Sequence, residues 1–435
     1  MKASYIILGG GISGLSLASF LDGSAIVVER EAEVGGLSRS FSLNGIAYDI
    51  GPHIMFSKNQ EVLDLHTSMT PTNTLRRSNQ IVLNGRFIKY PFENDLAGLD
   101  PVDRDYCLNE FLNNPYEMDQ PSNMLQFFLS TFGEGITRLY LQPYNEKIWK
   151  FDPSYMDLQM VERIPKPPRE DVIASARGVS TEGYTHQLYF NYPKVGGFQT
   201  LVDQYRRRAE SKGQIIQDNF TITIIKETST GWIVSDGNRS IYGERLINCM
   251  PLQELFKYII PPPEIKISLS KMLHNSIYII IVQVRKDNIG DHFSLYIPDK
   301  SIIFHRLSKL NFLGDAYRLP GAASTLMAEV TFRPGSHLST LSESAVLGRT
   351  IGDLARLGFI DPRDVIDTAV RMEPYAYVVY NLAHRHNVDA VLVHLRGMGI
   401  DSVGRFAEFE YLNSDAVVER TLKLARALNA GHGAV

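Results

Sequence analysis

A glycine-rich turn at residues 9–14 constrains the fold of this chain more than any other part of the sequence. Its residues, GGGISG, satisfy the pattern GxGxxG. An apolar run at residues 3–8 precedes the turn and predicts a buried strand, and residues 12–21 favour a helix. A strand, a glycine turn and a helix in this order predict the phosphate-binding turn of a Rossmann-like dinucleotide-binding fold.

The three glycines of the pattern have separate physical roles. Gly9 permits the tight turn, Gly11 lets a pyrophosphate approach the backbone, and Gly14 lets the helix pack closely on the strand. Ile12 and Ser13 begin the helix, whose free N–H groups would face the phosphates. We therefore expect these five residues to bind the diphosphate of a dinucleotide.

An acidic residue ends the next expected strand. Residues 25–29 form a second apolar run that ends in Glu29, about 20 residues beyond the turn. A carboxylate at this place accepts hydrogen bonds from ribose hydroxyls and disfavours a 2′-phosphate, so NADP is not expected in this site. Arg30 follows and is included in the predicted site. The alternative is a surface carboxylate at a strand end that binds no ligand.

A second glycine pair follows the acidic residue. It consists of Gly35 and Gly36 and is followed by Leu37 and Ser38. A glycine pair at this place distinguishes FAD sites from NAD sites in the flavoenzymes named below, so we expect these four residues to contact FAD. A plain loop is the alternative.

Composition limits the classes of protein to which the chain can belong. Its 435 residues are enough for two or three substructures, and its net charge of −4 argues against nucleic-acid binding. Two cysteines cannot form a disulfide framework, so we expect a reducing cytoplasm. The most apolar run, residues 277–284, is too short to span a bilayer. No cluster of His, Cys and Asp has metal-ligand spacing, so no metal is expected.

The order of the expected elements predicts an α/β fold, α+β overall. A Rossmann-like FAD-binding domain would be discontinuous, a mainly helical substrate domain would be inserted into it, and a second domain would hold an antiparallel sheet. The expected ranges are 1–89, 195–262 and 390–435 for the FAD-binding domain, 90–169 for the helical domain, and 170–194 with 263–389 for the antiparallel sheet.

Five short segments give the chain a family resemblance over residues 3–428. They are YDIGPHIMF at 48–56, YPFEN at 90–94, PYNEKIW at 143–149 with ERIP at 162–165, LYIP at 295–298 with FHR at 304–306, and GRFAEFEY at 404–411. In these segments and in their order, the chain resembles UDP-galactopyranose mutases, within the wider group of protoporphyrinogen oxidases and amine oxidases.

The resemblance implies a reaction without net redox change. Members of the family interconvert the pyranose and furanose forms of a sugar linked to a nucleotide diphosphate, in polysaccharide or natural-product synthesis. Reduced FAD acts through an N5 adduct of the sugar, and NADPH or NADH is a possible external reductant. The expected partner is therefore a nucleotide-diphosphate sugar, and a homo-oligomer is compatible with the sequence.

The resemblance also assigns residues to roles. The departing diphosphate requires guanidinium groups, because they match phosphate oxygens and stay charged. Arg163 and Arg306 match these arginines, and His53 and Arg405 match residues beside the reactive flavin ring. Gly51, Gly404, Asn413 and Asp415 join the expected cofactor site, and the expected substrate residues are Tyr90, Glu93, Tyr140, Asn145, Trp149, Tyr296, Tyr377 and Tyr411. The alternatives are surface ion pairs for the arginines and structural roles for the aromatic residues and Asn145.

Glu93 departs from the family pattern. Relatives carry Gln there, which contacts the base of UDP and offers both a donor and an acceptor, whereas an ionised Glu offers only acceptors. Guanine presents adjacent N1–H and N2–H groups, which suit a carboxylate. We therefore hypothesise that the preferred nucleotide is not UDP; the alternative is that Glu93 points to solvent.

Three smaller departures concern the walls of the expected site. Tyr140 stands where relatives stack a phenylalanine on the base, which retains the ring and adds a hydroxyl. Val378 stands after Tyr377 where a proline is usual, and Pro52 stiffens the loop that carries His53.

Two other functions remain open at this stage. An FAD-dependent oxidase or desaturase of the amine oxidase or protoporphyrinogen oxidase type would need an apolar or aromatic substrate cage and no diphosphate clamp. A catalytically silent flavoprotein that acts as a binding module is the third candidate function. Arg163 and Arg306 favour the mutase over the oxidase. The silent flavoprotein is disfavoured because every expected flavin and diphosphate position is present in the sequence.

Overall fold

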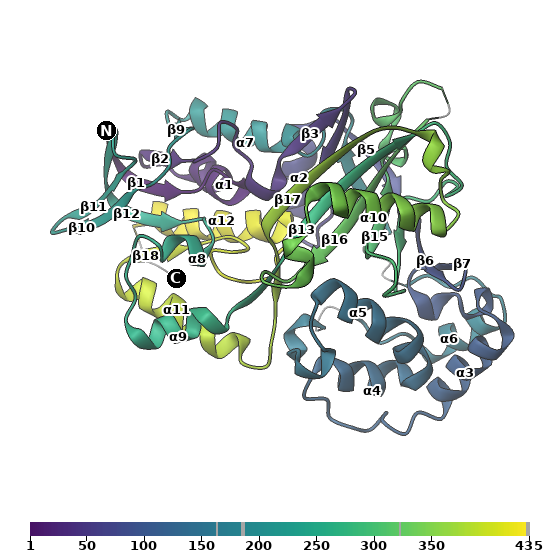
Figure 1. The fold of residues 1–435 in the computed structure, drawn as a ribbon. Helices are drawn as coiled ribbons and strands as arrows, with labels where there is room; N and C mark the ends of the chain where they lie inside the picture. The colour runs from purple at the N-terminus through teal and green to yellow at the C-terminus, as the bar shows by residue number, and fades with distance from the viewer. Residues whose placement is uncertain (162–163, 184–187, 322, 432–435) are drawn as a thin grey trace.

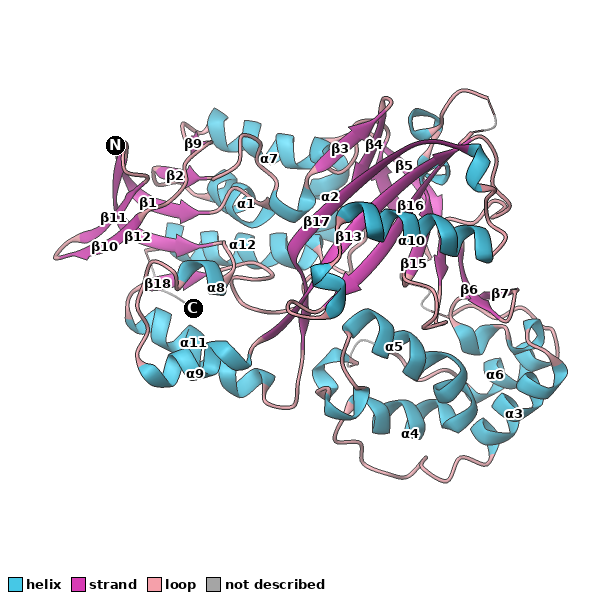
Figure 2. Ribbon diagram, viewed as in Figure 1, coloured by secondary structure: helices cyan, strands magenta, loops and turns pink. Residues whose placement is uncertain are grey.

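Two seven-stranded sheets and a helical segment make up the protein, which we describe from a computed structural model (Figure 1). The structure describes residues 1–161, 164–183, 188–321 and 323–431. The first sheet and its helices contain the N-terminal strand. The second sheet lies beside it, and the helical segment packs below the second sheet in the view of Figure 2.

The first sheet is built around a parallel core. Its strand order is β10-β11-β12-β1-β2-β9, and β18 pairs with the second half of β12. The parallel strands are β1 (Lys2–Leu8), β2 (Ala25–Val28), β9 (Ile215–Gln217), β12 (Ser240–Asn248) and β18 (Ile400–Ser402). The antiparallel hairpin β10 (Ile224–Thr228) and β11 (Gly231–Ser235) extends one edge.

Helix α1 (Ile12–Phe20) is buried along its whole length against this sheet. Its glycine and serines leave room for α7 (Gln199–Ser211) and α12 (Ser414–Asn429) to pack on it. The Ser16 and Thr421 hydroxyls lie 2.9 Å apart between α1 and α12. Small side chains therefore let three helices meet at the end of the sheet that carries the glycine turn.

The second sheet is antiparallel apart from one pair. Its order is β17-β13-β16-β15-β14-β6-β7, and only β14 and β6 run parallel. The strands are β17 (Val365–Val379), β13 (Leu273–Val284), β16 (Ser324–Phe332), β15 (Arg306–Lys309), β14 (Ser294–Tyr296), β6 (Asn79–Leu83) and β7 (Arg86–Lys89). Helix α10 (Glu343–Arg356) crosses one face of it (Figure 1).

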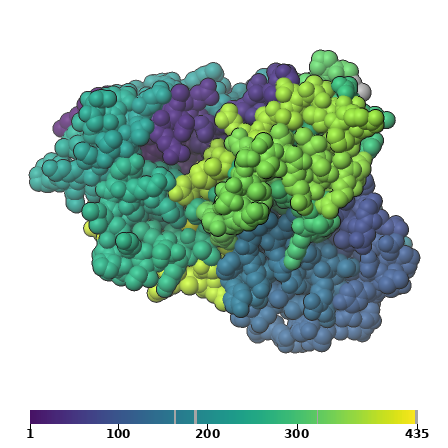
Figure 3. Space-filling view, in the orientation of Figure 1, coloured from purple at the N-terminus to yellow at the C-terminus, as the bar shows by residue number. Residues whose placement is uncertain are grey.

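The helical segment lies against the second sheet, as the blue atoms beside the green ones in Figure 3 show. It comprises α3 (Pro101–Leu112), α4 (Met124–Ile136), a π-helical turn (Thr137–Leu141), α5 (Gln142–Trp149) and α6 (Arg169–Ala176). Gly133 kinks α4 with a φ of 73°, and a Cβ there would lie 2.4 Å from the Glu110 carbonyl oxygen of α3. The kink thus depends on the absence of a side chain.

The remaining elements complete both layers. They are β3 (Ser40–Leu43) with β4 (Ile46–Asp49), β5 (Thr72–Arg76) with β8 (Tyr189–Pro193), and the helices α2 (Gln60–Met69), α8 (Leu252–Leu255), α9 (Pro263–Lys271) and α11 (His384–Gly397). Within the described ranges, every helix is too short or too polar to cross a membrane.

The α/β fold class with a Rossmann-like unit and a second, mainly antiparallel sheet is confirmed. The apolar run at 277–284 forms the buried part of β13. One pairing differs from the expected layout, because β6 and β7 lie within the range 1–89 yet join the second sheet through β14. Their sequences, NQIVL and RFIK, hold short apolar runs that would suit either sheet, so the sequence could not indicate which sheet they join.

The close approach of α1 to the glycine turn gives a direct test. A Cβ on Gly14 would lie 2.1 Å from the Gly9 carbonyl oxygen, so Gly14→Ala must push the helix off the turn. We expect a loss of roughly 1–3 kcal/mol in the free energy of unfolding, measured by denaturant titration. Gly348→Ala is the control, because nothing lies near that exposed position of α10 and the change should be neutral or stabilising. Equal unfolding midpoints for the two variants would contradict the packing role.

Candidate active site

A cavity of about 250 Å³ opens at the ends of the parallel strands, beside the glycine turn. Ten of the predicted cofactor residues line this cavity. They come from the phosphate turn, the acidic strand end and the second glycine pair: Gly9, Gly11, Ile12, Ser13, Glu29, Arg30, Gly35, Gly36, Leu37 and Ser38. The carboxylate of Glu29 accepts hydrogen bonds from the backbone N–H groups of Gly10 (2.9 Å) and Glu31 (3.0 Å). These bonds fix the carboxylate at the strand end, where a ribose would meet it.

The two glycine segments fit a bound diphosphate. Gly35 donates its N–H to the Gly10 carbonyl at 2.8 Å, and a Cβ on Gly36 would come within 3.3 Å of the Gly11 Cα. Gly35 and Gly36 have φ angles of 128° and 54°, which side-chain-bearing residues rarely adopt. A narrow backbone cradle at the start of a helix can accept the phosphates of a dinucleotide such as FAD.

The other predicted cofactor residues lie around this cradle in different ways. Gly14 packs α1 on the turn, and a Cβ on Gly404 would lie 2.3 Å from the Ser13 Oγ. Gly51 and Asn413 line a second cavity instead. Asp415 lies in the first turn of α12, where burial raises its pKa and Ser57 hydrogen-bonds to it.

The second cavity, of about 400 Å³, lies against the second sheet and the helical segment. It shares Leu37, His53, Arg405 and Ser414 with the first cavity, so the two spaces meet. Every described residue predicted to contact substrate lines it: Tyr90, Glu93, Tyr140, Asn145, Trp149, Tyr296, Arg306, Tyr377 and Tyr411. Arg163, the other predicted diphosphate arginine, lies outside the described residues.

The loop that carries His53 is held by a buried carboxylate. Asp49 accepts hydrogen bonds from the Tyr192 hydroxyl (2.7 Å) and the Phe198 N–H (3.1 Å), and burial raises its pKa to about 6. Gly51 follows with a φ of 80° and lets the chain turn into the cavity. This anchoring places His53 at the junction of the two cavities.

His53 is neutral at physiological pH. Burial, together with the positive charges of Arg405 and Arg306, lowers its pKa to about 3. Its Nδ1 finds no hydrogen-bond partner within the described part of the chain, and its ring packs on Phe198. A neutral ring with an available nitrogen at the junction suits a hydrogen bond to a bound group better than proton transfer.

Arg306 is paired with a carboxylate that sequence reasoning missed. Its Nη2 donates to Oε2 of Glu329 at 2.6 Å and its Nε to Oε1, and Glu329 is fully buried. The two residues face each other across the β15–β16 ladder. Only this strand register could have shown the pairing in advance. The pair leaves the Nη1 hydrogens of the fork for a ligand but offsets much of its charge.

Arg405 provides the positive charge at the junction. Its Nε donates to the Leu412 carbonyl at 2.7 Å and its Nη1 to the Ala376 carbonyl at 3.2 Å, and its guanidinium lies over the Tyr411 ring. Carbonyl oxygens orient the guanidinium without removing its charge. A negative charge that develops at the junction would be stabilised there.

Aromatic rings connect the two ends of the second cavity. Phe92, Tyr140 and Tyr144 form a nearly parallel stack with ring centroids 5.2 and 5.5 Å apart. Tyr144 also contacts Tyr296 (5.4 Å). At the junction, Trp149, Tyr377 and Tyr411 contact one another at 5.5–5.8 Å. The cavity thus has two aromatic ends, with Tyr296 and Arg306 between them.

The rings already hold one another in place. Tyr140 packs between Phe92 and Tyr144, so a base would extend this stack rather than meet a free Tyr140 face. Trp149 donates its indole N–H to Asn145 Oδ1 at 2.8 Å, and Asn145 donates to the Leu141 carbonyl at 2.7 Å. The Asn145 amide therefore orients Trp149 as well as lining the cavity.

Glu93 is buried rather than directed to solvent. Its residue is 6% exposed and lines the second cavity, and burial raises the pKa of its carboxyl to about 7. No ion pair neutralises it within the described part of the chain. The solvent-facing alternative is therefore wrong, because the Phe92–Asn94 turn packs under α6.

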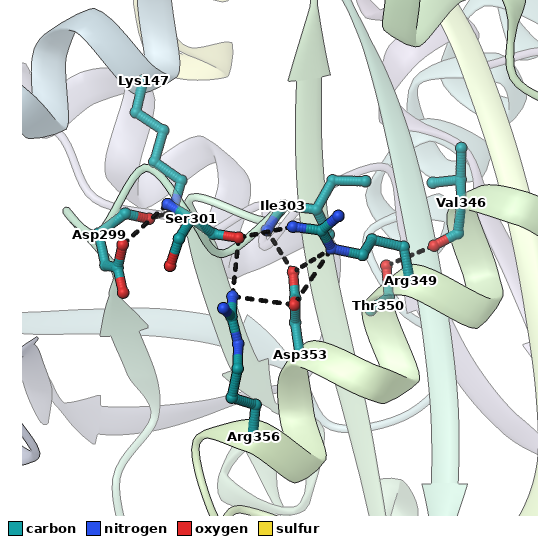
Figure 4. A network of polar contacts seen from close by, with 9 residues as sticks. All are labelled: Lys147, Asp299, Ser301, Ile303, Val346, Arg349, Thr350, Asp353 and Arg356. Atoms are coloured by element: carbon teal, nitrogen blue, oxygen red, sulfur yellow. Dashed lines mark hydrogen bonds and ion pairs between the residues drawn. The ribbon is translucent and has the colours of Figure 1, made fainter.

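A polar network fixes the hairpin that carries Tyr296 and Arg306 (Figure 4). Asp353 of α10 accepts the Ile303 N–H at 2.6 Å, and two arginines of the same helix donate to the Ser301 carbonyl. From the other side, Lys147 Nζ donates to the carbonyls of Ile297 (2.8 Å) and Asp299 (2.7 Å). The β14–β15 loop is thus held by α10 and by α5 of the helical segment.

Several other residues that line the cavities were not predicted. Arg39, Thr221, Ile222 and Tyr375 line the first cavity, and Arg77, Asn79 and Tyr144 line the second. Asn79 donates to the Tyr296 hydroxyl at 3.0 Å. The described residues hold no group of three or more His, Cys, Asp and Glu side chains suited to a metal ion.

Comparison with known proteins agrees with this geometry. Residues 7–68 match the sequence model of the family described as NAD(P)-binding Rossmann-like domain, which contains the glycine turn and Glu29. Over that region the chain is therefore similar to Rossmann-like nucleotide-binding domains. Its whole fold is shared with reduced UDP-galactopyranose mutase, with a TM-score of 0.88 and 23% identity over 98% of this chain and 96% of that chain.

Oxidases share the fold more distantly. Cyclohexylamine oxidase from Brevibacterium oxydans has a TM-score of 0.68 and 14% identity over 99% of both chains. A protein from an Exiguobacterium species, provisionally named a protoporphyrinogen oxidase, has a TM-score of 0.77 and 13% identity over 99% of both chains. The resemblance to UDP-galactopyranose mutases within this wider group is confirmed at the level of the fold.

The buried Glu93 carboxyl predicts a pH effect on stability. Its folded pKa of about 7 exceeds its ordinary value of 4.5, so the unfolded chain loses this proton first as pH rises. The free energy of unfolding therefore falls between about pH 4.5 and 7 by roughly 3 kcal/mol, and the loss persists above that range. Glu93→Gln should lack this part of the pH dependence. The measurement is the free energy of unfolding of both proteins by denaturant titration from pH 5 to pH 8. The same change with pH in both proteins would contradict the prediction.

The Arg306–Glu329 pair predicts strong coupling. Arg306→Met leaves the buried Glu329 carboxylate unpaired and should lower the free energy of unfolding by roughly 3–5 kcal/mol. Adding Glu329→Gln removes the stranded charge and should recover more than half of that loss. The measurement is a double-mutant cycle by denaturant unfolding, and additive effects of the two changes would show that the pair is not energetically coupled.

Proposed function

We propose that this protein is a flavin-dependent mutase that interconverts the pyranose and furanose forms of a sugar carried on a nucleoside diphosphate. The observation that carries the proposal is the meeting of the two cavities at Leu37, His53, Arg405 and Ser414. One cavity is lined by the two glycine segments and Glu29, groups that suit the diphosphate and ribose of FAD. The other offers a guanidinium and several tyrosine hydroxyls for a substrate that reaches the same junction.

FAD is the cofactor that we assign to the first cavity. When bound in its reduced form, it would supply a nucleophile for the anomeric carbon of the sugar without net oxidation. Gly11, Gly35 and Gly36 would accept its diphosphate at the start of α1, and Glu29 would hold its ribose. These are roles that we propose for this chain's residues from their positions around the cavity.

The protein would hold the leaving diphosphate by hydrogen bonds. Arg306 can donate from Nη1 while Glu329 fixes the other edge of its guanidinium. Burial raises the pKa of Tyr377 far above its ordinary value, so its hydroxyl stays protonated and can donate to a phosphate oxygen. Tyr296 and Tyr411 lie within the same cavity. Arg163 remains a proposed second clamp residue on the family resemblance alone.

The junction residues would favour the reduced cofactor. Arg405 keeps its charge there and stabilises an anionic ring by Coulomb attraction. His53, held neutral, contributes a hydrogen-bonding ring and backbone rather than a proton. The contacting rings of Trp149, Tyr377 and Tyr411 would limit the access of water to the sugar end of the cavity.

An oxidase or desaturase of the amine oxidase type is the second candidate. The aromatic cage at the junction and the likeness of the fold to cyclohexylamine oxidase favour it. Amine oxidation does not require the Arg306 guanidinium or the hydroxyls of Tyr296 and Tyr377 in the second cavity. These groups therefore favour the mutase.

One experiment separates the two functions. Holoprotein reduced with dithionite under anaerobic conditions is given either a UDP-pyranose or a GDP-pyranose. It should convert one of them into its furanose isomer, which chromatography would detect. The oxidised holoprotein should be inactive, because the proposed chemistry requires the reduced cofactor. Oxygen consumption and hydrogen peroxide release with primary amines, without sugar interconversion, would instead establish the oxidase.

A further inference from the structure

The end of the second cavity that lies away from the cofactor junction has a distinct character. Glu93 lies there, in the same turn as Phe92, whose ring begins the stack with Tyr140 and Tyr144. Arg306 and Tyr296 lie between this end and the junction with the cofactor cavity. A nucleotide sugar with its sugar at the junction and its diphosphate at Arg306 would therefore place its base beside Glu93 and the aromatic stack.

The Glu93 carboxylate lacks the donors that a buried charge requires. The Ser175 hydroxyl donates to the backbone carbonyl of Glu93, not to its side chain. Apart from its own backbone N–H, no described residue donates to the carboxylate or pairs with it. A buried carboxylate without partners is unfavourable. A ligand that brings N–H groups to this end would remove that cost.

We propose that Glu93 selects guanine, so that the nucleotide sugar is a GDP sugar; this inference rests on the proposed mutase function. Guanine presents N1–H and N2–H side by side, and both can donate to the two oxygens of one carboxylate. Uracil presents a single N–H flanked by two carbonyl oxygens. One carboxylate oxygen can accept that N–H, but the other then faces a uracil carbonyl oxygen with no proton between them. The carboxylate therefore favours guanine and opposes uracil through the same two atoms.

The aromatic stack supports a base at this end without choosing between bases. The Phe92, Tyr140 and Tyr144 rings lie within 13–24° of parallel, and a flat base can continue the series. Since every base has such a face, stacking supplies affinity and Glu93 supplies discrimination. Selection thus depends on one side chain that a conservative substitution can change.

Binding of free nucleotides tests the inference separately from catalysis. Titration calorimetry at pH 8, where the Glu93 carboxyl with its pKa of about 7 is mostly ionised, with reduced holoprotein should give a dissociation constant for GDP at least about tenfold lower than those for UDP, dTDP and ADP, as expected for one bidentate base contact. Glu93→Gln, whose amide offers a donor and an acceptor, should lose that preference and bind UDP at least as tightly as GDP. Glu117→Gln is the matched control, an equal charge change at an exposed position of the same helical segment, and should leave the ratio unchanged.

The outcomes are distinguishable. UDP, dTDP or ADP binding as tightly as GDP to the unsubstituted protein would overturn the inference and leave the mutase proposal intact. An unchanged GDP preference in Glu93→Gln would also overturn it, because the selection would then come from other residues. No binding of any of these nucleotides would overturn both the inference and the proposed function.

Discussion

The contact between the start of α1 and the glycine turn sets the position of everything else in the candidate site. Because Gly14 lies directly against the Gly9 carbonyl, the first turn of α1 is held at the ends of the parallel strands. The second glycine pair packs against the same turn, and α12 packs against α1 through Ser16 and Thr421. The first cavity, and through α12 the junction residue Ser414, depend on this close approach of backbone to backbone.

Electrostatics in the second cavity are more balanced than a simple arginine clamp would suggest. Glu329 offsets much of the charge of Arg306, whereas Arg405 donates to carbonyl oxygens and lies over the Tyr411 ring. A guanidinium that pairs with no carboxylate in the described part of the chain therefore lies at the junction of the two cavities. That distribution suits a site in which negative charge appears beside the cofactor as well as on the diphosphate.

The sequence was most informative where local chemistry repeats a known pattern. The glycine turn, Glu29 and the second glycine pair line one cavity, and the tyrosines and Arg306 line the adjoining one, as motif order indicated. Glu329, Asp49 and Lys147 were not found, because their roles depend on strand register and on contacts between segments distant in sequence. The pairing of β6 with β14 could not be inferred either, because the short apolar run of β6 fits either sheet.

The hydrogen bonds of Lys147 to the β14–β15 loop limit how the length of this loop can vary. Burial lowers the pKa of this lysine to about 7, so near neutral pH its amine is held by two carbonyls in a partly uncharged state. Asp353, Arg349 and Arg356 of α10 hydrogen-bond to the same loop from the opposite side. Contacts from two directions therefore fix the length and path of the loop. An insertion or deletion there would shift the strands that bear Tyr296 and Arg306. Changes of substrate during evolution would therefore arise by replacing side chains of the helical segment that line the second cavity, while this loop keeps its length.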